Sequence, residues 1–463
     1  MENNGQFGGT PGEDANVQPA WNLGFDGTGV QIAIVDDGVE YTHPDLAANY
    51  NPVGSYDFNY SDDDPLADLP FDAHGTSVAG VAAARDESTC GVGVAYRANV
   101  SGVRLISSFT TDALEADGLT YRLDVNDISS NSWGPADSGT VFGGVGDLAL
   151  AAVEQGALTG RGGLGTVYVW AGGNGLQSGD YANADSYVSS RYTIGVAAVD
   201  NTGGQAWYSE PGASLHVAAP SNGDGSGDEV GITTTDRTGS AGYNGYPASP
   251  ECTNDFGGTS SATPLMSGVV ALMLEANPTL TWRDVQHILA ETATQNDPTD
   301  SDWTVNEAGF HINHKYGFGR VDALAAVNLA QNWVNVSPDS NYASPVIPIN
   351  APIPNNAPAV TGSVAVTVPN GTFRLEHAIV RLNVDHSERG DLEIILTAPS
   401  GTQSVLLAPR PNDTGDDIVD YDLMTVRNWG ENPNGIWTLS AVSYTHLRAH
   451  ETKANLVCRL LLE

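Results

Sequence analysis

Lysine is almost absent from this chain of 463 residues and occurs only at Lys315 and Lys453. Asp and Glu number 56 against 18 Lys and Arg, which gives a formal net charge of −38. A nucleic-acid partner needs a basic face that neutralises phosphates, so this balance argues against nucleic-acid binding. We expect most of the carboxylates to form a solvated acidic surface and some to attract basic substrates and divalent cations.

Long apolar runs are also missing. No stretch approaches the roughly 20 residues that a membrane-spanning helix requires, so no membrane span is expected. Residues 1–5, Met-Glu-Asn-Asn-Gly, show neither the basic nor the apolar region of a secretion signal. Either a signal and a pro-segment have been left off, or the sequence is a fragment.

Cysteine is rare as well, with Cys90, Cys252 and Cys458 in the whole chain. Three cysteines leave at least one without a partner. One disulfide would indicate an oxidising compartment, and buried free thiols are the alternative.

A run of small residues at 257–263, Gly-Gly-Thr-Ser-Ser-Ala-Thr, precedes apolar residues at helical spacing. This pattern predicts a helix that begins near Ser260, with Pro264 in its first turn, where a proline costs little. The free amides and the positive dipole end of a helix start stabilise an anion, which suits a nucleophilic serine. An ordinary core helix is the alternative for this run taken alone.

Two other stretches supply what a nucleophilic serine needs. Asp36 follows the apolar run 30–35, which reads as a buried strand, and His74 opens a second small-residue helix. An imidazole acts as a base when a carboxylate fixes its tautomer, so Asp36, His74 and Ser260 can serve as acid, base and nucleophile. Asn174, in Ala-Gly-Gly-Asn-Gly after the strand-like run 166–170, is our candidate for an oxyanion donor.

The chain alternates short apolar runs with small-residue helical segments up to about residue 330. The predicted strands lie at 30–35, 100–105, 128–132, 166–171 and 193–198. This rhythm predicts an α/β fold with a parallel sheet, helices on both faces and functional residues at the strand ends. Beyond a Pro-, Asn- and Ser-rich linker, runs at 363–368, 378–384, 391–396 and 436–441 alternate like half-buried strands of an all-β module.

With these motifs in order, the chain resembles the subtilisin-like serine proteases, and among them the kexin and furin branch of proprotein convertases. The order of acid, base and nucleophile is that of subtilisin. The motifs that carry the branch resemblance are Ile-Val-Asp-Asp-Gly at 34–38, His-Pro-Asp-Leu at 43–46, Cys-Gly-Val-Gly-Val-Ala-Tyr at 90–96, Ser-Trp-Gly-Pro at 132–135, Trp-Tyr-Ser-Glu at 207–210 and Leu-Thr-Trp-Arg-Asp at 280–284.

The resemblance implies a preference for basic substrates. Asp137 and Asp185 match the acids of the first specificity pocket, and Asp37 and Asp72 are candidates for the second, which would make the substrate dibasic. Ser132, Trp133 and Gly134 belong to the substrate-binding motif. Glu115 matches an acid that some relatives use farther from the cut, but Phe142 or Gly143 stands where its usual partner is expected.

The resemblance also implies bound calcium, which carboxylate clusters suit because Ca²⁺ takes six to eight oxygen ligands. One site would use Asp57, Asp62 and Asp64. A second would use Asp137, Asp180 and Glu210 beside the first pocket. A third would use Asp45 with Glu87, although Glu87 replaces the amide residue expected there and the N-terminal ligand has no counterpart in residues 1–16.

The resemblance assigns the remaining features as follows. Cys90 and Cys252 match a pair that is bridged in furin-like enzymes, and a removable pro-segment aids folding in this family. We expect an irregular segment at 1–16, a catalytic domain at 17–335, a linker at 336–358 and a P-domain β-sandwich at 359–443. Residues 444–463 carry Arg448, Lys453 and Arg459. They look like a non-native tail in place of the closing strand, with a native amphipathic end as the alternative.

The sequence therefore predicts a secreted, monomeric, calcium-dependent serine endopeptidase that cuts proteins or peptides after paired basic residues. Two alternatives stay open. One is a broad-specificity secreted subtilisin whose acids only bind calcium, and the other is a catalytically silent relative that acts as a binding protein.

Overall fold

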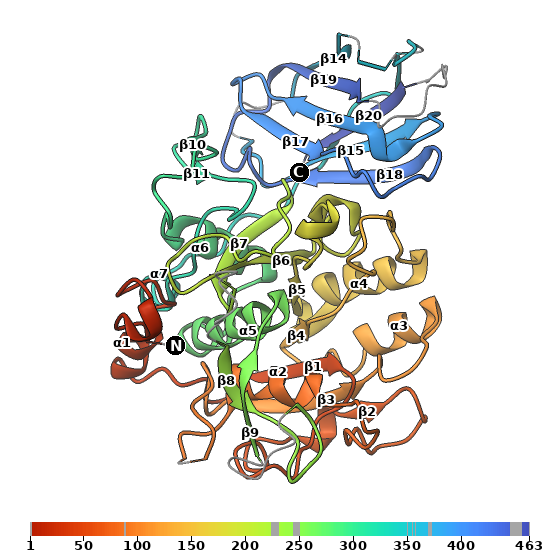
Figure 1. Ribbon diagram of the computed structural model, residues 1–463. Helices are drawn as coiled ribbons and strands as arrows, with labels where there is room; N and C mark the ends of the chain where they lie inside the picture. Colours follow the sequence, from red (N-terminus) through yellow and green to blue (C-terminus); the bar gives the residue numbers. More distant parts are fainter. Residues whose placement is uncertain are drawn as a thin grey trace.

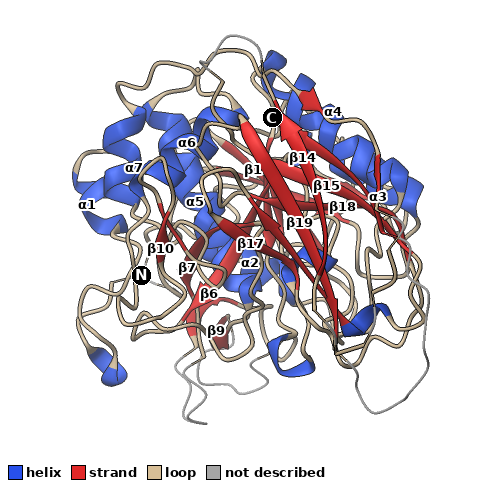
Figure 2. Cartoon of the chain, turned by 90° about the horizontal axis from the view of Figure 1, so that it is seen from above, coloured by secondary structure: helices blue, strands red, loops and turns tan. Residues whose placement is uncertain are grey.

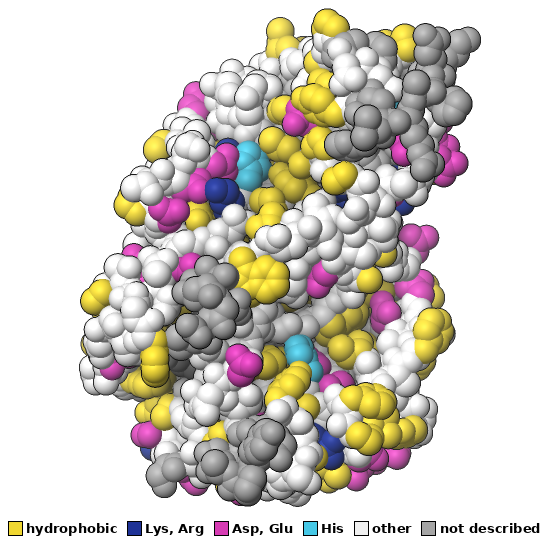
Figure 3. All heavy atoms as spheres, viewed as in Figure 1, with side chains coloured by type: hydrophobic (Ala, Val, Ile, Leu, Met, Phe, Trp, Pro, Cys, Tyr) yellow, Lys and Arg dark blue, Asp and Glu magenta, His cyan; other side chains and the backbone are white. Residues whose placement is uncertain are grey.

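The computed structural model describes the chain except residues 1, 88, 224–230, 244–250, 350, 354, 357, 369–372, 445–455 and 463. An α/β domain carries the N-terminal three quarters of the chain, and a β-domain formed by later strands is stacked on one end of it (Figure 1). On the face drawn in Figure 3, Asp and Glu side chains are spread widely and Lys and Arg appear in few places.

The α/β domain is organised around a seven-stranded sheet in the order β2-β3-β1-β4-β5-β6-β7, with neighbouring strands parallel. The strands are β1 (Gln31–Asp36), β2 (Tyr56–Asp57), β3 (Asn99–Arg104), β4 (Ile128–Asn131), β5 (Val167–Ala171), β6 (Thr193–Val199) and β7 (Leu215–Pro220). The predicted parallel sheet is thus confirmed. Its central strands are buried on both faces, which explains their continuous apolar sequences.

Helices cover the sheet on both sides. In Figure 1, β4 and β5 lie between α5 on one side and α3 and α4 on the other, and Figure 2 shows α1, α6 and α7 on the flank opposite α3 and α4. The helices are α1 (Val17–Asn22), α2 (His74–Ala83), α3 (Asp112–Leu119), α4 (Asp147–Gly163), α5 (Thr259–Ala276), α6 (Trp282–Thr292) and α7 (Ala323–Ala330). Within the described residues, no helix is both long and apolar enough to cross a membrane.

Two hairpins extend from this domain. The strands β8 (Ile232–Thr235) and β9 (Cys252–Phe256) lead into α5, and β10 (Thr304–Val305) pairs with β11 (His311–Ile312) near the β-domain. Each pair is antiparallel.

The β-domain is a sandwich of two antiparallel sheets that share one apolar core. One sheet has the order β14-β19-β16-β17, and the other has β12-β20-β15-β18, with β13 also paired to β20. The strands are β12 (Tyr342–Ala343), β13 (Ile347–Pro348), β14 (Val360–Val366), β15 (Ala378–Val384), β16 (Leu392–Thr397), β17 (Gln403–Leu407), β18 (Ile418–Thr425), β19 (Gly435–Ser443) and β20 (Leu456–Leu462).

Two expectations about this domain need correction. The segment at 336–358 is not only a linker, because β12 and β13 join the sheet through β20. The closing strand is not missing, because β20 runs along β15 and buries Leu460 and Leu462 in the core. An apolar strand fits any sheet edge that offers free backbone groups. Of the predicted tail, residues 445–455 and 463 lie outside the described residues.

Candidate active site

Three elements distant in sequence bring the predicted catalytic side chains to one region. Asp36 is the last residue of β1, His74 is the first residue of α2, and Ser260 is the second residue of α5. The helices α2 and α5 pack against each other, and both contact β1. The carboxyl end of a parallel strand and two helix starts therefore meet there, as the fold class predicts.

His74 and Asp36 form a hydrogen-bonded pair. The Nδ1 atom of His74 lies 2.9 and 3.0 Å from the two carboxylate oxygens of Asp36, which is fully buried. Burial lowers the pKa of His74, but the charge and hydrogen bond of Asp36 outweigh it and raise the pKa to about 8. The pairing leaves Nε2 of His74 free to exchange a proton.

Asp37 fixes the backbone of the same helix start. Its two carboxylate oxygens accept hydrogen bonds from the amides of His74 at 3.0 Å and Gly75 at 2.7 Å. A Cβ atom at Gly75 would lie 2.3 Å from the Gly38 carbonyl oxygen, so only glycine lets α2 approach β1 this closely. Burial, followed by the charge of Asp36, raises the pKa of Asp37 to about 7.

Ser260 is held by Ser132, the residue after β4. The Ser260 hydroxyl donates to the Ser132 carbonyl at 3.3 Å, and the Ser132 hydroxyl donates to the Ser260 carbonyl at 3.0 Å. Ser132 also lines a cavity of about 280 Å³ together with His74. The structure records no hydrogen bond between the described side chains of Ser260 and His74, and in unliganded enzymes such contacts often tighten only when substrate binds.

Pro264 explains why the Ser260 carbonyl accepts no hydrogen bond from the backbone of α5. Because α5 begins at Thr259, Pro264 is its sixth residue and lies beyond the first turn, contrary to the sequence prediction. A proline there has no N–H for the carbonyl four residues earlier, which is that of Ser260. The hydrogen bond from Ser132 satisfies this carbonyl instead.

Asn174 lies beside the nucleophile. Its Oδ1 atom accepts from the amide and the hydroxyl of Thr259 at 2.8 and 3.0 Å, while its Nδ2 atom donates to Asp137 at 3.3 Å. Gly258 adopts φ +74, and a Cβ atom there would lie 3.2 Å from Asn174 Oδ1. These contacts orient the carboxamide next to the start of α5, where the predicted oxyanion donor should be.

The cavity beside His74 has acidic and aromatic walls. Asp36, Asp37 and Asp72 line it together with Phe71, whose side chain is 71% exposed. Asp72 is already engaged, because it accepts from Arg104 at 2.6 Å and from Ser107 at 2.8 Å. Asp37 accepts from the backbone amides of His74 and Gly75 rather than from a cation, so it is the better placed of the two predicted acids to hold a cation here.

Arg104 is a site residue that the sequence reasoning missed. This arginine is buried at the end of β3 and binds Asp57, Asp68 and Asp72 at 2.6–2.8 Å. A basic residue at the end of a strand predicted to be buried is a signal that could have revealed it, because a buried arginine needs paired carboxylates.

A second, much smaller cavity of about 20 Å³ is lined by Asp137 and Asp185, the predicted acids of the first specificity pocket. The predicted calcium ligands Asp180 and Glu210 line it as well. Gly134 lies directly against Asp185, since a Cβ atom there would be 3.0 Å from Asp185 Oδ2. Burial, and then the neighbouring carboxylates, raise the pKa of Asp185 to about 7 and that of Glu210 well above its usual value.

Arg410 of the β-domain reaches this second cavity. Its Nε atom donates to Asp180 at 3.1 Å, and its guanidinium also binds Asp413 at 2.8 Å and the Val141 carbonyl. The β-domain thus contributes a buried cation to the acid cluster. No local pattern predicts this contact, because the two partners are separated by 230 positions.

The other two predicted metal sites differ in how well their residues fit a cation. Both oxygens of Asp57 are engaged, by Arg104 and by the amides of Asn59 and Tyr60. Asp45 by contrast keeps one buried carboxylate oxygen, Oδ1, without a hydrogen-bond partner. Over the described ranges, no three His, Cys, Asp or Glu side chains are gathered closely enough to hold a metal ion.

The remaining predicted ligands also have defined surroundings. Asp62 accepts from the amide of Asp64, which in turn accepts from the Tyr41 hydroxyl. Glu87 is exposed on the loop before Cys90.

Glu115 is engaged as well. Its two oxygens accept from Thr110 at 2.6 Å and from Tyr187 at 2.7 Å. Phe142, which stands where a partner acid was considered, packs against Tyr421 of the β-domain. Trp133 is held by two hydrogen bonds. Its indole donates to the Val35 carbonyl, and its own carbonyl accepts from the Trp170 indole.

The predicted disulfide is confirmed. Cys90 and Cys252 are bridged, with Cα atoms 5.3 Å apart, and Cys458 is a free, buried cysteine. Cys252 begins β9, which leads directly into α5. The bridge therefore ties the loop after α2 to the strand that precedes the nucleophile.

Comparison with known proteins decides the family. Residues 27–319 match the Subtilase family, and residues 375–454 match the Proprotein convertase P-domain. The chain belongs to the subtilase family. In this subtilase the match to the Proprotein convertase P-domain covers most of the β-domain. The order of the two domains is therefore that of the kexin and furin branch.

Individual relatives agree with this assignment. The subtilase is 42% identical to the PC3-like endoprotease variant B of Hydra vulgaris, over 94% of this chain and 61% of that protein. It is 40% identical to human Furin, over 92% of this chain and 53% of that protein. The crystal structure of the serine protease of Aeromonas sobria superposes with a TM-score of 0.88 and 26% identity, covering 98% of this chain and 92% of that one. The chain spans only about half to three fifths of the two curated relatives.

The His74 pKa predicts how activity depends on pH. A general base must be neutral, so kcat/KM should rise with pH and level off only above the His74 pKa of about 8. Below that pH the activity should fall about tenfold per pH unit, because the neutral fraction of His74, which is the active base, shrinks in that proportion. Initial rates between pH 6 and 9.5, with enzyme stability checked at each pH, would measure this. A plateau already complete at pH 6.5 would contradict the assignment.

Proposed function

We propose that this subtilase is a serine endopeptidase that hydrolyses peptide bonds after basic residues, with a preference for paired basic residues. The main observation in support is the hydrogen-bonded Asp36–His74 pair. The pair lines the same cavity as Ser132, and Ser132 is hydrogen-bonded to Ser260. In the proposed mechanism Ser260 attacks the carbonyl carbon while His74 takes its proton and later delivers it to the leaving amine. Asp36 orients and stabilises the charged imidazole.

The oxyanion of the tetrahedral intermediate would be held by the Ser260 amide and Asn174 Nδ2. The side chain of Asn174 is fixed through Thr259, so its donor is positioned before the reaction begins. Its weak hydrogen bond to Asp137, at 3.3 Å, is the contact that the oxyanion would replace.

The acidic cavities support the basic preference. A lysine or arginine side chain of the substrate would pair with Asp137 and Asp185 in the first pocket, and a second basic residue would pair with Asp37. Burial, and then the neighbouring carboxylates, raises the pKa of Asp185 and of Asp37, and a bound cation would lower both values again.

Peptide specificity tests this proposal. The value of kcat/KM should be at least tenfold higher for a fluorogenic peptide with Lys-Arg before the cut than for one with Ala-Phe. Equal rates on both peptides would favour a broad-specificity subtilisin. Failure of the folded protein to react with a fluorophosphonate probe would favour a silent relative that only binds.

Calcium is part of the proposal. The proposed calcium ligands are Asp45, whose buried Oδ1 atom has no partner among the described residues, and Asp137, Asp180 and Glu210, which line one small cavity although Asp180 is also paired with Arg410. A bound ion would supply charge neutralisation, which lets these groups stay ionised. Glu87 and the Asp57, Asp62 and Asp64 loop are weaker candidates, since Asp57 is engaged by Arg104.

Calcium removal should destabilise the protein. An ion that binds only the folded state at 100 times its Kd adds about 2.7 kcal/mol to the free energy of unfolding. Treatment with EDTA should therefore lower Tm, and added Ca²⁺ should restore it. The Glu210→Gln variant should lose much of this response. A Tm that does not change between EDTA and millimolar Ca²⁺ would contradict the assignment.

We also infer an extracytoplasmic location for a monomeric enzyme acting on protein or peptide substrates. The support is the Cys90–Cys252 disulfide, because such bridges persist in oxidising compartments. The pro-segment that the family resemblance implies would assist folding of the α/β domain.

A further inference from the structure

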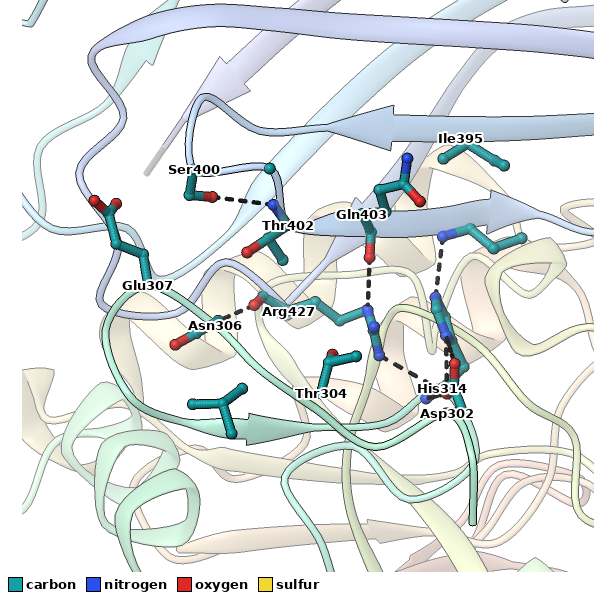
Figure 4. Close-up of a pocket in the computed structure, with 13 residues that line it drawn as sticks. Asp302, Thr304, Asn306, Glu307, His314, Ile395, Ser400, Thr402, Gln403 and Arg427 are labelled. Atoms are coloured by element: carbon teal, nitrogen blue, oxygen red, sulfur yellow. Dashed lines mark hydrogen bonds and ion pairs between the residues drawn. The ribbon is translucent and has the colours of Figure 1, made fainter.

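A cavity of about 630 Å³ lies between the α/β domain and the β-domain, away from the proposed active site. Figure 4 shows its walls. The β10 hairpin and the Asp302–His314 pair come from the α/β domain, and Ser400, Thr402, Gln403 and Arg427 come from the β-domain. Its volume is in the range that holds a small molecule or a few residues of peptide.

The histidine in this wall is fully occupied by the protein. Its Nδ1 atom lies 3.0 Å from both oxygens of Asp302, and its Nε2 atom accepts from the amide of Val405 at 3.0 Å. A ring that accepts at Nε2 must be neutral, and burial lowers the pKa of His314 in agreement. The Asp302 oxygens are directed at His314, including its backbone amide at 2.5 Å.

Arg427 is the unusual group. Its side chain is 5% exposed, and its Nε atom donates to the Gln403 carbonyl at 3.0 Å. Among the described residues, its buried Nη1 atom has no hydrogen-bond partner, and the nearest carboxylate oxygen, Asp302 Oδ2, is 4.0 Å away. Figure 4 shows the end of this guanidinium directed at Asp302 and His314 across the open space.

Buried donors without an acceptor are rare in folded proteins. A guanidinium presents a planar fork of N–H groups that matches a carboxylate. The exposed Glu307 stands at the same cavity, and the chain as a whole is strongly acidic, so a ligand that also carries a positive charge would be favoured over a bare anion.

We propose that this interdomain cavity binds the carboxylate group of a ligand that also carries a cation, with Arg427 as the carboxylate-binding residue. The carboxylate could belong to a free basic amino acid derivative or to the C-terminal residue of a peptide. The site uses none of the residues assigned to catalysis, so a negative result here would not count against the proposed protease activity.

Calorimetric titration of the full chain, as Ser260→Ala to prevent turnover, tests this site. The probes are N-acetylarginine and its amide, and an acetylated pentapeptide ending in Lys-Arg as the free acid and as the amide. At least one acid should bind tenfold or more tightly than its amide. Equal binding of the two small probes, together with an acid preference for the peptide, would identify a chain end. An acid preference for N-acetylarginine would identify a free carboxylate ligand.

Three variants locate the effect. Arg427→Gln should weaken binding of the acid at least tenfold and remove the difference between acid and amide, while Arg427→Lys should recover part of it. Arg374→Gln, which removes an exposed arginine of the β-domain that bonds only its neighbour's carbonyl among the described residues, should change nothing. Binding to the active site would persist in all three.

A variant that fills the cavity tests the proposal without depending on the folding of Arg427→Gln. Thr304→Trp keeps Arg427 and places a bulky ring in the cavity from the exposed strand β10, so it should block the acid-specific binding. Tm is measured for every variant, and Thr304→Trp decides the outcome if Arg427→Gln does not fold. Equal affinities for acid and amide in the parent protein, or acid-specific binding that survives both variants, would overturn the proposal.

Discussion

Replacing Ser260 with alanine should lower kcat by about five to six orders of magnitude, because the attacking oxygen is lost and only binding and oxyanion stabilisation remain. The fold should be unaffected, since the Ser260 hydroxyl makes a single weak hydrogen bond, to the Ser132 carbonyl at 3.3 Å. The measurement is hydrolysis of a fluorogenic Lys-Arg peptide at saturating concentration, with reaction toward a fluorophosphonate probe as a second readout.

Ser261 offers a matched control in the same turn of α5. Its hydroxyl is buried and lies 2.6 Å from that of Ser221, so Ser261→Ala perturbs local packing without removing the nucleophile. We expect turnover within about tenfold of the parent, because losing a neutral hydrogen bond costs about 1 kcal/mol. If Ser260→Ala kept parental rates, or if both variants lost activity equally, Ser260 would not be the nucleophile.

Replacing Asn174 with alanine should lower kcat by about two to three orders of magnitude and change KM little. The oxyanion exists only in the transition state and the intermediate, so its donor acts on the rate rather than on substrate binding. Steady-state kinetics on the same peptide would separate the two parameters.

A second variant distinguishes the donor from its support. Thr259→Val removes one of the two hydrogen bonds that hold Asn174 Oδ1 but leaves Nδ2 in place, so it should cost far less than Asn174→Ala. A loss that appears mainly in KM would mean that Asn174 binds substrate instead. Equal losses in the two variants would mean that its position, rather than its amide donor, is what matters.

The local sequence was enough to predict the framework of the site. Two apolar runs predict strands that end at Asp36 and near Ser132, and two small-residue segments predict helices that begin near His74 and Ser260. Each pattern is contained within about ten residues. Contacts that join distant segments gave no such signal. Arg104 stands out as a basic residue in a buried strand, but nothing in the sequence identifies its three carboxylate partners, and Arg410 reaches Asp180 from another domain.

The errors have physical causes as well. Local sequence does not predict β7, since its short run contains His216 and ends at Pro220, and burial in the sheet overrides that composition. The basic residues of 444–463 favour a tail, whereas β20 within that stretch is mostly apolar and suits a sheet. Pro264 was placed in the first turn because the start of a helix is uncertain by one or two residues from sequence.

Pro264 has one more effect on the nucleophile. Since the Ser260 carbonyl is bound to Ser132 rather than to the next turn of α5, the reactive end of the helix is anchored to the edge of the central sheet. Partial unwinding of α5 near Ala276, at its far end, would then leave the Ser260 hydroxyl in the same position. The position of the nucleophile therefore depends on β4 of the central sheet as well as on the helix that carries it.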